Sequence, residues 1–300
     1  MAPIKPQWNR LIRFVAVETS QVHIGQPVDP VLDVGLAVYQ MQPVKAFEIL
    51  GTALDPSAQV TSNVLTVKSL LAPLAREEVK LVRCLGLNYA DHAAEANMPK
   101  PPAPVLFYKP VMSLTGPLAS VIIPKVAQPG KKHLPDYEVE LTIVIGKPAK
   151  NVSEDEALDY ILAYTGGNDV SFRYHQMRVS QWGFSKGFDN TTPIGPCLVS
   201  TSAIKDPQNL RLSCTVNGQV LQNGVTSDQL FTVRQTVSAL SQGTTLEPGS
   251  IIMTGTPKGV GFVRKPPIYI KHGDDMRVWI GGGIGTLVNS VVEEGVGAKL

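Results

Sequence analysis

Short apolar stretches separated by turn-forming residues recur along this chain, and this pattern constrains its fold more than any other feature. After residue 81 the stretches follow one another closely, and they have the length of β-strands. These predicted strands cover residues 105–108, 120–123, 139–145, 210–216, 250–254, 276–280 and 286–292. Two earlier stretches, 11–17 and 34–39, are also β-like and are separated by Gly25-Gln26-Pro27. The sequence therefore predicts a mostly β protein with a few helices.

One of the expected helices follows Ser153. Ser153 and Glu156 form a capping-box pattern ahead of apolar residues at helical spacing. Gly166-Gly167 would end this helix just before Asn168-Asp169.

Two further helices are expected in the same part of the chain. Thr232 and Gln235 repeat the capping-box pattern ahead of a helix that Gly243 would end. Residues 88–96 have a helix-forming composition and are bounded by Pro99. Together with the strands, these signals predict a small N-terminal β module over residues 1–75 and a larger domain over residues 76–300.

Composition excludes several classes of function. The chain has 27 basic and 25 acidic residues, a net charge of +2, so it has no excess positive charge for nucleic acid. Its three cysteines form no C-x-x-C pair, which argues against a zinc or redox motif and favours a reducing compartment. No apolar run approaches the roughly 20 residues that cross a bilayer, and Arg13 interrupts the first apolar stretch. We therefore expect a cytosolic protein without nucleic-acid or membrane partners.

Two glutamates stand in a strand-like pattern that suggests a metal site. Residues 139, 141, 143 and 145 are apolar, so Glu138 and Glu140 project together from the opposite face of the strand. Carboxylates about 7 Å apart along a strand repel each other when buried, unless a cation lies between them. Oxygen ligands of this kind suit Mg²⁺, Mn²⁺ or Ca²⁺. Taken alone, the pattern fits a solvated strand face with two acids somewhat better.

Two other polar groups suggest chemistry. His92 and Glu95 would share one helix face, and a carboxylate that orients an imidazole is how a general base is built. An ordinary surface contact between them is the simpler interpretation. Asp169 is followed closely by Arg173, His175 and Gln176, which weakly favours a site over a turn cap.

Eight short blocks, taken in order, resemble the fumarylacetoacetate hydrolase superfamily. They are Gly86-Leu87-Asn88-Tyr89-Ala90-Asp91-His92, Phe107-Tyr108-Lys109-Pro110, Asp136-Tyr137-Glu138-Val139-Glu140-Leu141, Asn168-Asp169-Val170-Ser171-Phe172-Arg173, Lys186-Gly187-Phe188-Asp189, Pro193-Ile194-Gly195-Pro196, Val216-Asn217-Gly218 and Thr254-Gly255-Thr256-Pro257-Lys258-Gly259-Val260-Gly261. Departures from the pattern occur at Asp189-Asn190-Thr191 and at Trp182-Gly183-Phe184, and they leave the substrate open.

The resemblance implies a fold and a site. The fold would be a mixed β-sandwich roll, usually a homodimer, with the N-terminal module as a variable addition. The site residues it implies are Glu138, Glu140 and Asp169 as ligands of Mg²⁺ or Mn²⁺, with Ca²⁺ possible in a crystal, His92, Glu95 and Lys186 as catalytic residues, and Arg173, Gln176, Thr256 and Tyr89 as substrate-binding residues.

The same resemblance implies chemistry on a small keto acid. Open positions on the metal would take the keto and carboxylate oxygens of the substrate and stabilise an enolate. If His92 and Glu95 activate water, the expected reaction is hydrolysis of a C–C bond in an acylpyruvate or a fumarylacetoacetate-type acid. Without that water, the same enolate would serve a decarboxylase (a lyase) or a keto–enol tautomerase acting on an oxaloacetate-like acid. A non-catalytic binding protein on the same fold is the alternative outside enzymes.

Overall fold

A computed structural model describes residues 3–296, and strands dominate it, as the sequence predicts. The strands of the largest sheet run, from one edge to the other, β2 (Val22–Pro27), β3 (Lys45–Leu50), β4 (Gln59–Leu71), β1 (Arg10–Ala16), β13 (Thr192–Ser200), β11 (Ile161–Asn168), β10 (Val139–Ile145), β16 (Ile251–Met253), β5 (Val82–Gly86) and β6 (Val105–Lys109), with β7 (Leu114–Thr115) paired to β13. A five-strand sheet has the order β15 (Gln219–Val225), β14 (Arg211–Val216), β17 (Asp275–Ile280), β18 (Gly285–Glu293) and β8 (Val121–Ile123). The short strands β9 (Pro135–Asp136) and β12 (Ser171–Phe172) pair with each other.

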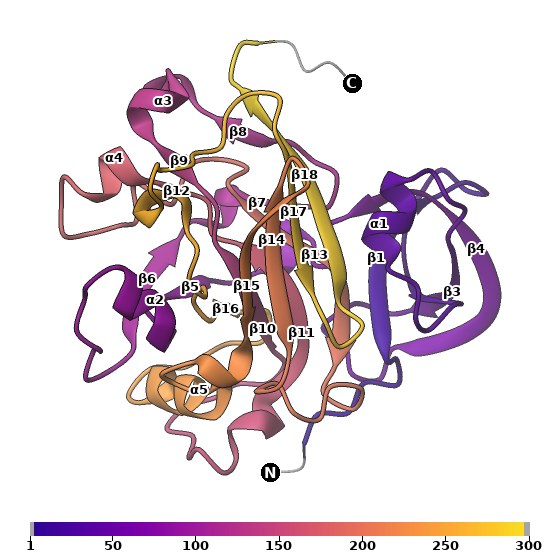
Figure 1. Ribbon diagram of the computed structural model, residues 1–300. Helices are drawn as coiled ribbons and strands as arrows, with labels where there is room; N and C mark the ends of the chain where they lie inside the picture. The colour runs from indigo at the N-terminus through magenta and orange to yellow at the C-terminus, as the bar shows by residue number, and fades with distance from the viewer. Residues whose placement is uncertain (1–2, 297–300) are drawn as a thin grey trace.

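The helices are short. They are α1 (Val34–Tyr39), α2 (Ala90–Glu95), α3 (Gly130–His133), α4 (Arg173–Gln176) and α5 (Val233–Ser241). Short 3₁₀ turns cover Arg76–Glu78, Val111–Ser113, Lys125–Ala127, Ala157–Tyr160, Thr226–Asp228 and Gly261–Val263. Four of the helices, α2 to α5, lie on the opposite side of the molecule from the N-terminal strands β1 to β4 (Figure 1). Within residues 3–296, no helix is long and apolar enough to cross a membrane.

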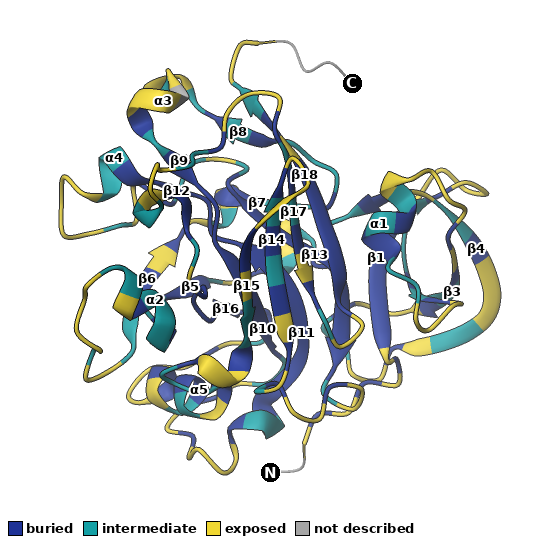
Figure 2. Cartoon of the chain, viewed as in Figure 1, coloured by how far each residue is buried: buried dark blue, intermediate teal, exposed yellow. Residues whose placement is uncertain are grey.

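The main core lies between the two larger sheets. Strand β10 is central to it, because Val139, Leu141, Ile143 and Ile145 all belong to the main apolar cluster, as their period-two spacing predicts. The other face of β10 is buried too, where Val144 joins a second cluster. Figure 2 shows β10 and β11 buried along their length. Glu138 and Glu140 therefore do not lie on a solvated face.

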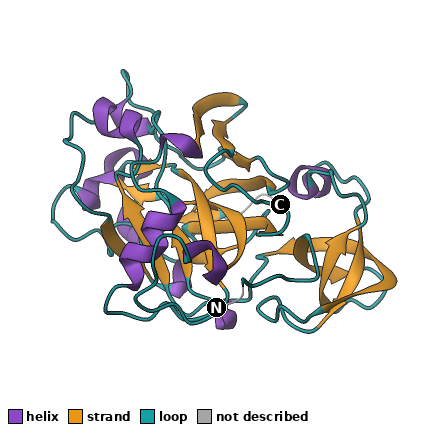
Figure 3. Ribbon diagram, turned by 90° about the horizontal axis from the view of Figure 1, so that it is seen from below, coloured by secondary structure: helices purple, strands orange, loops and turns teal. Residues whose placement is uncertain are grey.

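The N-terminal strands form an additional module beside this sandwich (Figure 3). Strand β1 joins the two parts: Arg10 and Leu11 pair with β13, whereas residues 12–16 pair with β2 and β4. A second link is polar, since the Asp33 carboxylate accepts hydrogen bonds from the backbone N–H and the hydroxyl of Thr286 on β18.

The strand predicted at residues 34–39 is wrong, because this segment is helix α1. Asp33 caps the helix by accepting a hydrogen bond from the backbone N–H of Leu36. A β-carbon on Gly35 would lie 1.8 Å from the carbonyl oxygen of Thr286, so the helix approaches β18 at a residue without a side chain. Tertiary packing thus outweighs the β propensity of the two valines.

The helix predicted after Ser153 is also wrong. The Ser153 hydroxyl and the Glu156 carboxylate do bond each other, but they precede only the 3₁₀ turn Ala157–Tyr160. Strand β11 then begins at Ile161 and is buried throughout, because it pairs with β10 on one side and β13 on the other. A strand buried on both faces is continuously apolar and imitates a buried helix in sequence. The helices predicted at 88–96 and after Thr232 are confirmed as α2 and α5, the latter with its capping box.

Candidate active site

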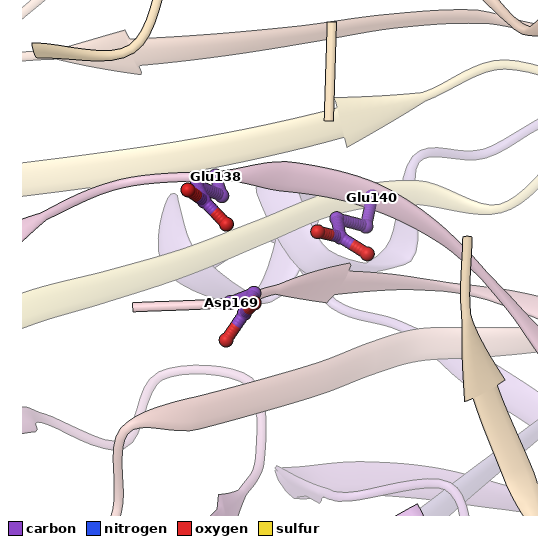
Figure 4. A group of neighbouring side chains, drawn as sticks. All are labelled: Glu138, Glu140 and Asp169. Atoms are coloured by element: carbon purple, nitrogen blue, oxygen red, sulfur yellow. The ribbon is translucent and has the colours of Figure 1, made fainter. Parts of the chain in front are cut away.

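Three carboxylates meet where β10 begins and β11 ends. The two strands are antiparallel, with Val139 opposite Asn168 and Glu140 opposite Gly167, so Asp169 follows the end of β11 directly beside Glu138. The backbone N–H of Asp169 donates to the carbonyl of Glu138 at 2.9 Å. One carboxylate oxygen from each of Glu138, Glu140 and Asp169 lies within 4.8 Å of the others, and all three side chains are buried (Figure 4).

Three basic side chains surround two of these carboxylates. Lys186 Nζ donates to Glu138 at 2.7 Å and to Asp169 at 2.5 Å, and Lys109 Nζ donates to the other oxygen of Asp169 at 2.6 Å. Arg173 donates to the second oxygen of Glu138 at 2.7 Å. Burial raises the pKa of Glu138, but Lys186 and Arg173 outweigh it and hold that pKa well below its usual range.

Glu140 has a different environment. Its carboxylate accepts a hydrogen bond from the backbone N–H of Gly255 at 2.7 Å, and within residues 3–296 no basic side chain forms an ion pair with it. Burial, together with the nearby Asp169 and Glu138 carboxylates, raises the pKa of Glu140 well above its usual value. An additional positive charge would therefore stabilise the ionised carboxylates most if it lay beside Glu140.

This arrangement fits a hard divalent cation. All three donors are carboxylates, and their oxygens are near enough to share one ion. No basic side chain in the described part of the chain forms an ion pair with Glu140. Oxygen-only donor sets favour Mg²⁺, Mn²⁺ or Ca²⁺ over metals that prefer thiolate ligands. The residues present thus match the metal site suggested by the sequence.

The imidazole of His92 stands on α2 at the same site. His92 Nδ1 lies 2.7 Å from a Glu95 oxygen. The Glu95 carboxylate also accepts hydrogen bonds from the backbone N–H of Gly259 at 2.9 and 3.0 Å, which fixes its orientation. With Nδ1 facing Glu95, Nε2 is the nitrogen left to act on another molecule.

A cavity of about 330 Å³ opens onto these groups. Its lining includes most of the site residues suggested by the sequence: His92, Glu138, Glu140, Arg173, Gln176, Lys186 and Thr256. Gln176 accepts a hydrogen bond from Arg173 at 2.9 Å. The hydroxyl of Thr256 accepts one from Gln222 at 2.7 Å. Asp169 and Glu95 do not line the cavity, but each contacts a side chain that does: Asp169 contacts Lys186, and Glu95 contacts His92.

Tyr89 is placed differently from the sequence expectation of a substrate contact. Its side chain is fully buried in the main core and does not line the cavity. Burial raises the pKa of its phenol, and its hydroxyl lies 3.5 Å from Gln229 Nε2. Tyr89 directly precedes α2, the helix that carries His92, and its ring belongs to the main core.

Two charged residues at the site were not anticipated from the sequence. Lys109 occupies a core-facing position of β6, two residues after the buried Phe107. A lysine on the apolar face of a strand is the sequence signal that could have indicated a buried charged site here. Asp136 pairs with Arg173 at 2.8 Å and accepts hydrogen bonds from the backbone N–H groups of Gly261 and Phe262. Asp136 therefore fixes Arg173 relative to the loop after β16.

Comparisons with known proteins point in one direction. A family model described as Fumarylacetoacetate (FAA) hydrolase C-terminal matches residues 81–292. A relative named caffeoylpyruvate hydrolase, from Neonothopanus nambi, is 60% identical over 98% of this chain and 96% of its own length. The mitochondrial oxaloacetate tautomerase Fahd2a of Rattus norvegicus is 36% identical over 97% of this chain and 94% of its own. The structure of a 2-hydroxyhepta-2,4-diene-1,7-dioate isomerase from Mycobacterium marinum matches with a TM-score of 0.76 and 35% identity, over 95% of this chain and 99% of that one.

Proposed function

This chain belongs to the fumarylacetoacetate hydrolase family, and from that premise we propose that it hydrolyses a C–C bond in an acylpyruvate. The observation that carries the proposal is that one cavity is lined both by Glu138 and Glu140 of the buried carboxylate group and by the imidazole of His92. The 60% identity to a protein named as a hydrolase of an acylpyruvate supports the reaction class.

We propose Glu138, Glu140 and Asp169 as the residues that hold a divalent cation, with Mg²⁺ or Mn²⁺ as its identity. A divalent cation supplies positive charge for the keto and carboxylate oxygens of the substrate and so favours the enolate form. The buried free cysteines support a reducing compartment, and we propose that this compartment is the cytosol. We propose that the protein assembles as a homodimer.

The reaction begins with water. His92 Nε2 takes a proton from a water molecule, while Glu95 stabilises the charge that forms on the imidazole. The water oxygen forms a bond to the acyl carbonyl carbon of the substrate. Lys186 and Arg173 are the cavity cations that can meet the negative oxygen that develops there.

The C–C bond between the acyl carbon and the methylene carbon then breaks, and its electron pair moves to the methylene side as pyruvate enolate. Protonation of that carbon by the imidazolium of His92 gives pyruvate and restores the base. The other product is the free acid of the acyl group, so one water is consumed and two acids are released.

Keto–enol tautomerisation is the second candidate, because a relative over nearly the whole chain carries the name oxaloacetate tautomerase. It would need the same carboxylate site and a proton carrier but no attacking water. The two reactions differ in their products, and a product-resolved assay separates them.

The test is an assay with Mg²⁺ or Mn²⁺ on acetylpyruvate, benzoylpyruvate and oxaloacetate, with all products quantified. We expect equal amounts of pyruvate and the second acid from an acylpyruvate, and loss of that activity in Glu140→Gln. The exposed Glu154→Gln serves as the matched control and should retain it. Release of CO₂ from oxaloacetate, or keto–enol conversion of it, faster than cleavage of either acylpyruvate would overturn the proposal.

A further inference from the structure

The cavity lining has a polar part and an apolar part. The polar part is joined by ion pairs and hydrogen bonds around Glu138, including those of Lys186 and Arg173. The apolar part consists of Leu85, Leu87, Ala96, Met98, Met177, Val179, Trp182, Val260, Phe262 and Val263. Because the polar part would hold the pyruvate half of a substrate, the apolar part remains for the acyl group.

Several side chains of the apolar part are exposed in the free chain. The exposed fractions are 50% for Met98, 66% for Met177, 58% for Val179 and 36% for Phe262. They come from different segments, yet all line one cavity. Convergent exposed apolar side chains beside a few polar groups mark a ligand site, since covering them with an apolar group is favourable.

Trp182 gives this apolar part a flat wall at a fixed place. Its ring lies so near the backbone of β5 that a β-carbon on Gly86 would be 2.4 Å from it. It also packs edge-on against Phe107, with 5.5 Å between the ring centroids. The carbonyl of Trp182 accepts a hydrogen bond from the backbone N–H of Lys186 at 3.1 Å, so the two residues lie one backbone turn apart.

Among the described residues, none that forms the apolar part of the lining is basic. The basic side chains among the described lining residues are those of His92, Arg173 and Lys186. Each of them already pairs with a carboxylate: His92 with Glu95, and the other two with Glu138. A second carboxylate at the far end of the acyl group would therefore enter an apolar environment without a partner, which is costly.

We infer that the acyl group of the substrate is an uncharged, planar aromatic group that packs on Trp182, and that Trp182 determines this specificity. The inference rests on the proposed acylpyruvate hydrolysis and adds the chemical class of the acyl group. Aromatic rings stack or meet edge-on with favourable energy beyond the area they bury, so the flat wall selects aryl over small alkyl groups.

The experiment compares kcat/KM, with Mg²⁺ present, for benzoylpyruvate, acetylpyruvate and fumarylpyruvate, whose acyl group carries a carboxylate. In the wild type we expect benzoylpyruvate to be preferred over the other two. Trp182→Ala should lower kcat/KM for benzoylpyruvate about 10- to 100-fold, and for acetylpyruvate about threefold at most. Trp182→Phe should restore most of the preference. Trp279→Ala, which removes a 38% exposed indole on β17 that does not line the cavity, is the control.

A gain-of-function variant tests the charge argument separately. Met177→Arg adds a cation at an exposed position of the apolar part, and it should raise kcat/KM for fumarylpyruvate relative to benzoylpyruvate. Equal use of the three substrates by the wild type, or equal loss of all three in Trp182→Ala, would overturn the inference.

Calorimetric titration keeps the two proposals distinguishable. If the wild type cleaves none of the three compounds, the proposed function fails, and titration with benzoylpyruvate and acetylpyruvate in Mg²⁺ still tests the pocket. Tighter binding of benzoylpyruvate that is lost in Trp182→Ala supports the aromatic site. Equal binding of both compounds contradicts it.

Discussion

Replacing Lys109 by methionine is expected to destabilise the protein by about 3 kcal/mol. The ammonium group of Lys109 lies 2.6 Å from Asp169, and both side chains are fully buried. Removing one partner of a buried ion pair typically costs about 3–5 kcal/mol, because the remaining charge has lost its compensation. Lys186 still contacts the other oxygen of Asp169, and this contact places the expected loss at the lower end of that range.

The assay is urea unfolding of the wild type, Lys109→Met, Asp169→Asn and the double variant, all without divalent metal. Because the double variant leaves neither charge unpaired, it should be more stable than the sum of the two single losses predicts, by about 2 kcal/mol. Lys258→Met is the matched control. Lys258 is 62% exposed and lies 3.9 Å from Asp91, and a surface ion pair of this kind contributes less than about 1 kcal/mol.

Two results would contradict this reasoning. A loss below about 1 kcal/mol in Lys109→Met would mean that Asp169 is compensated without Lys109. Strictly additive losses in the double variant would mean that the two groups do not interact across their 2.6 Å contact.

The remaining predictions concern the carboxylate site, His92 on α2, the cap of α5 and the dependence of stability on pH. Glu140→Gln should weaken Mn²⁺ binding in calorimetric titration, since it removes one of three anionic donors; unchanged affinity would exclude it as a ligand. His92→Ala should lower kcat about 10²–10⁴-fold with Mn²⁺ affinity retained, as measured by the same titration and steady-state kinetics; full turnover would reduce the His92 contact to a structural one. Thr232→Ala should cost about 1 kcal/mol in urea unfolding and leave kcat unaltered, because it removes the cap of α5; a change in kcat would contradict this. Burial lowers the pKa of both His133 and His175, so the unfolded chain takes up protons more readily and stability should fall as pH drops below about 6.5. Thermal unfolding at pH 5 to 8 should show a weaker fall in the double variant His133→Asn/His175→Asn, and an identical profile would refute it.

The sequence predicted the parts of the fold in which local pattern and tertiary environment agree. The alternation of apolar residues in 139–145 placed β10 and its direction of burial, and the capping box at Thr232 placed the start of α5. Local pattern failed at 34–39 and after Ser153, because a close approach at Gly35 and pairing on both sides of β11 decided those segments.

The candidate site was predicted in its residues more than in their environment. The period-two pattern placed Glu138 and Glu140 side by side, but it could not show that both faces of β10 are covered, and taken alone it favoured a solvated face. Asp169 was expected after a helix and instead follows strand β11, whose pairing with β10 brings it to Glu138. Local sequence pattern could not assign Lys109 to the site, because its partner Asp169 is 60 residues away in sequence.

Strand β1 has a consequence for engineering the N-terminal module. The family match begins at residue 81, which suggests a junction there for chimeras or truncations. However, Arg10 and Leu11 complete the edge of β13 at Leu198 and Val199, so a truncated chain would expose an apolar strand edge of the kind that promotes aggregation. Any donor module must therefore supply a first strand whose opening residues pair with the backbone of β13. The exchangeable unit is defined by this pairing of β1 with β13 rather than by the start of the family match.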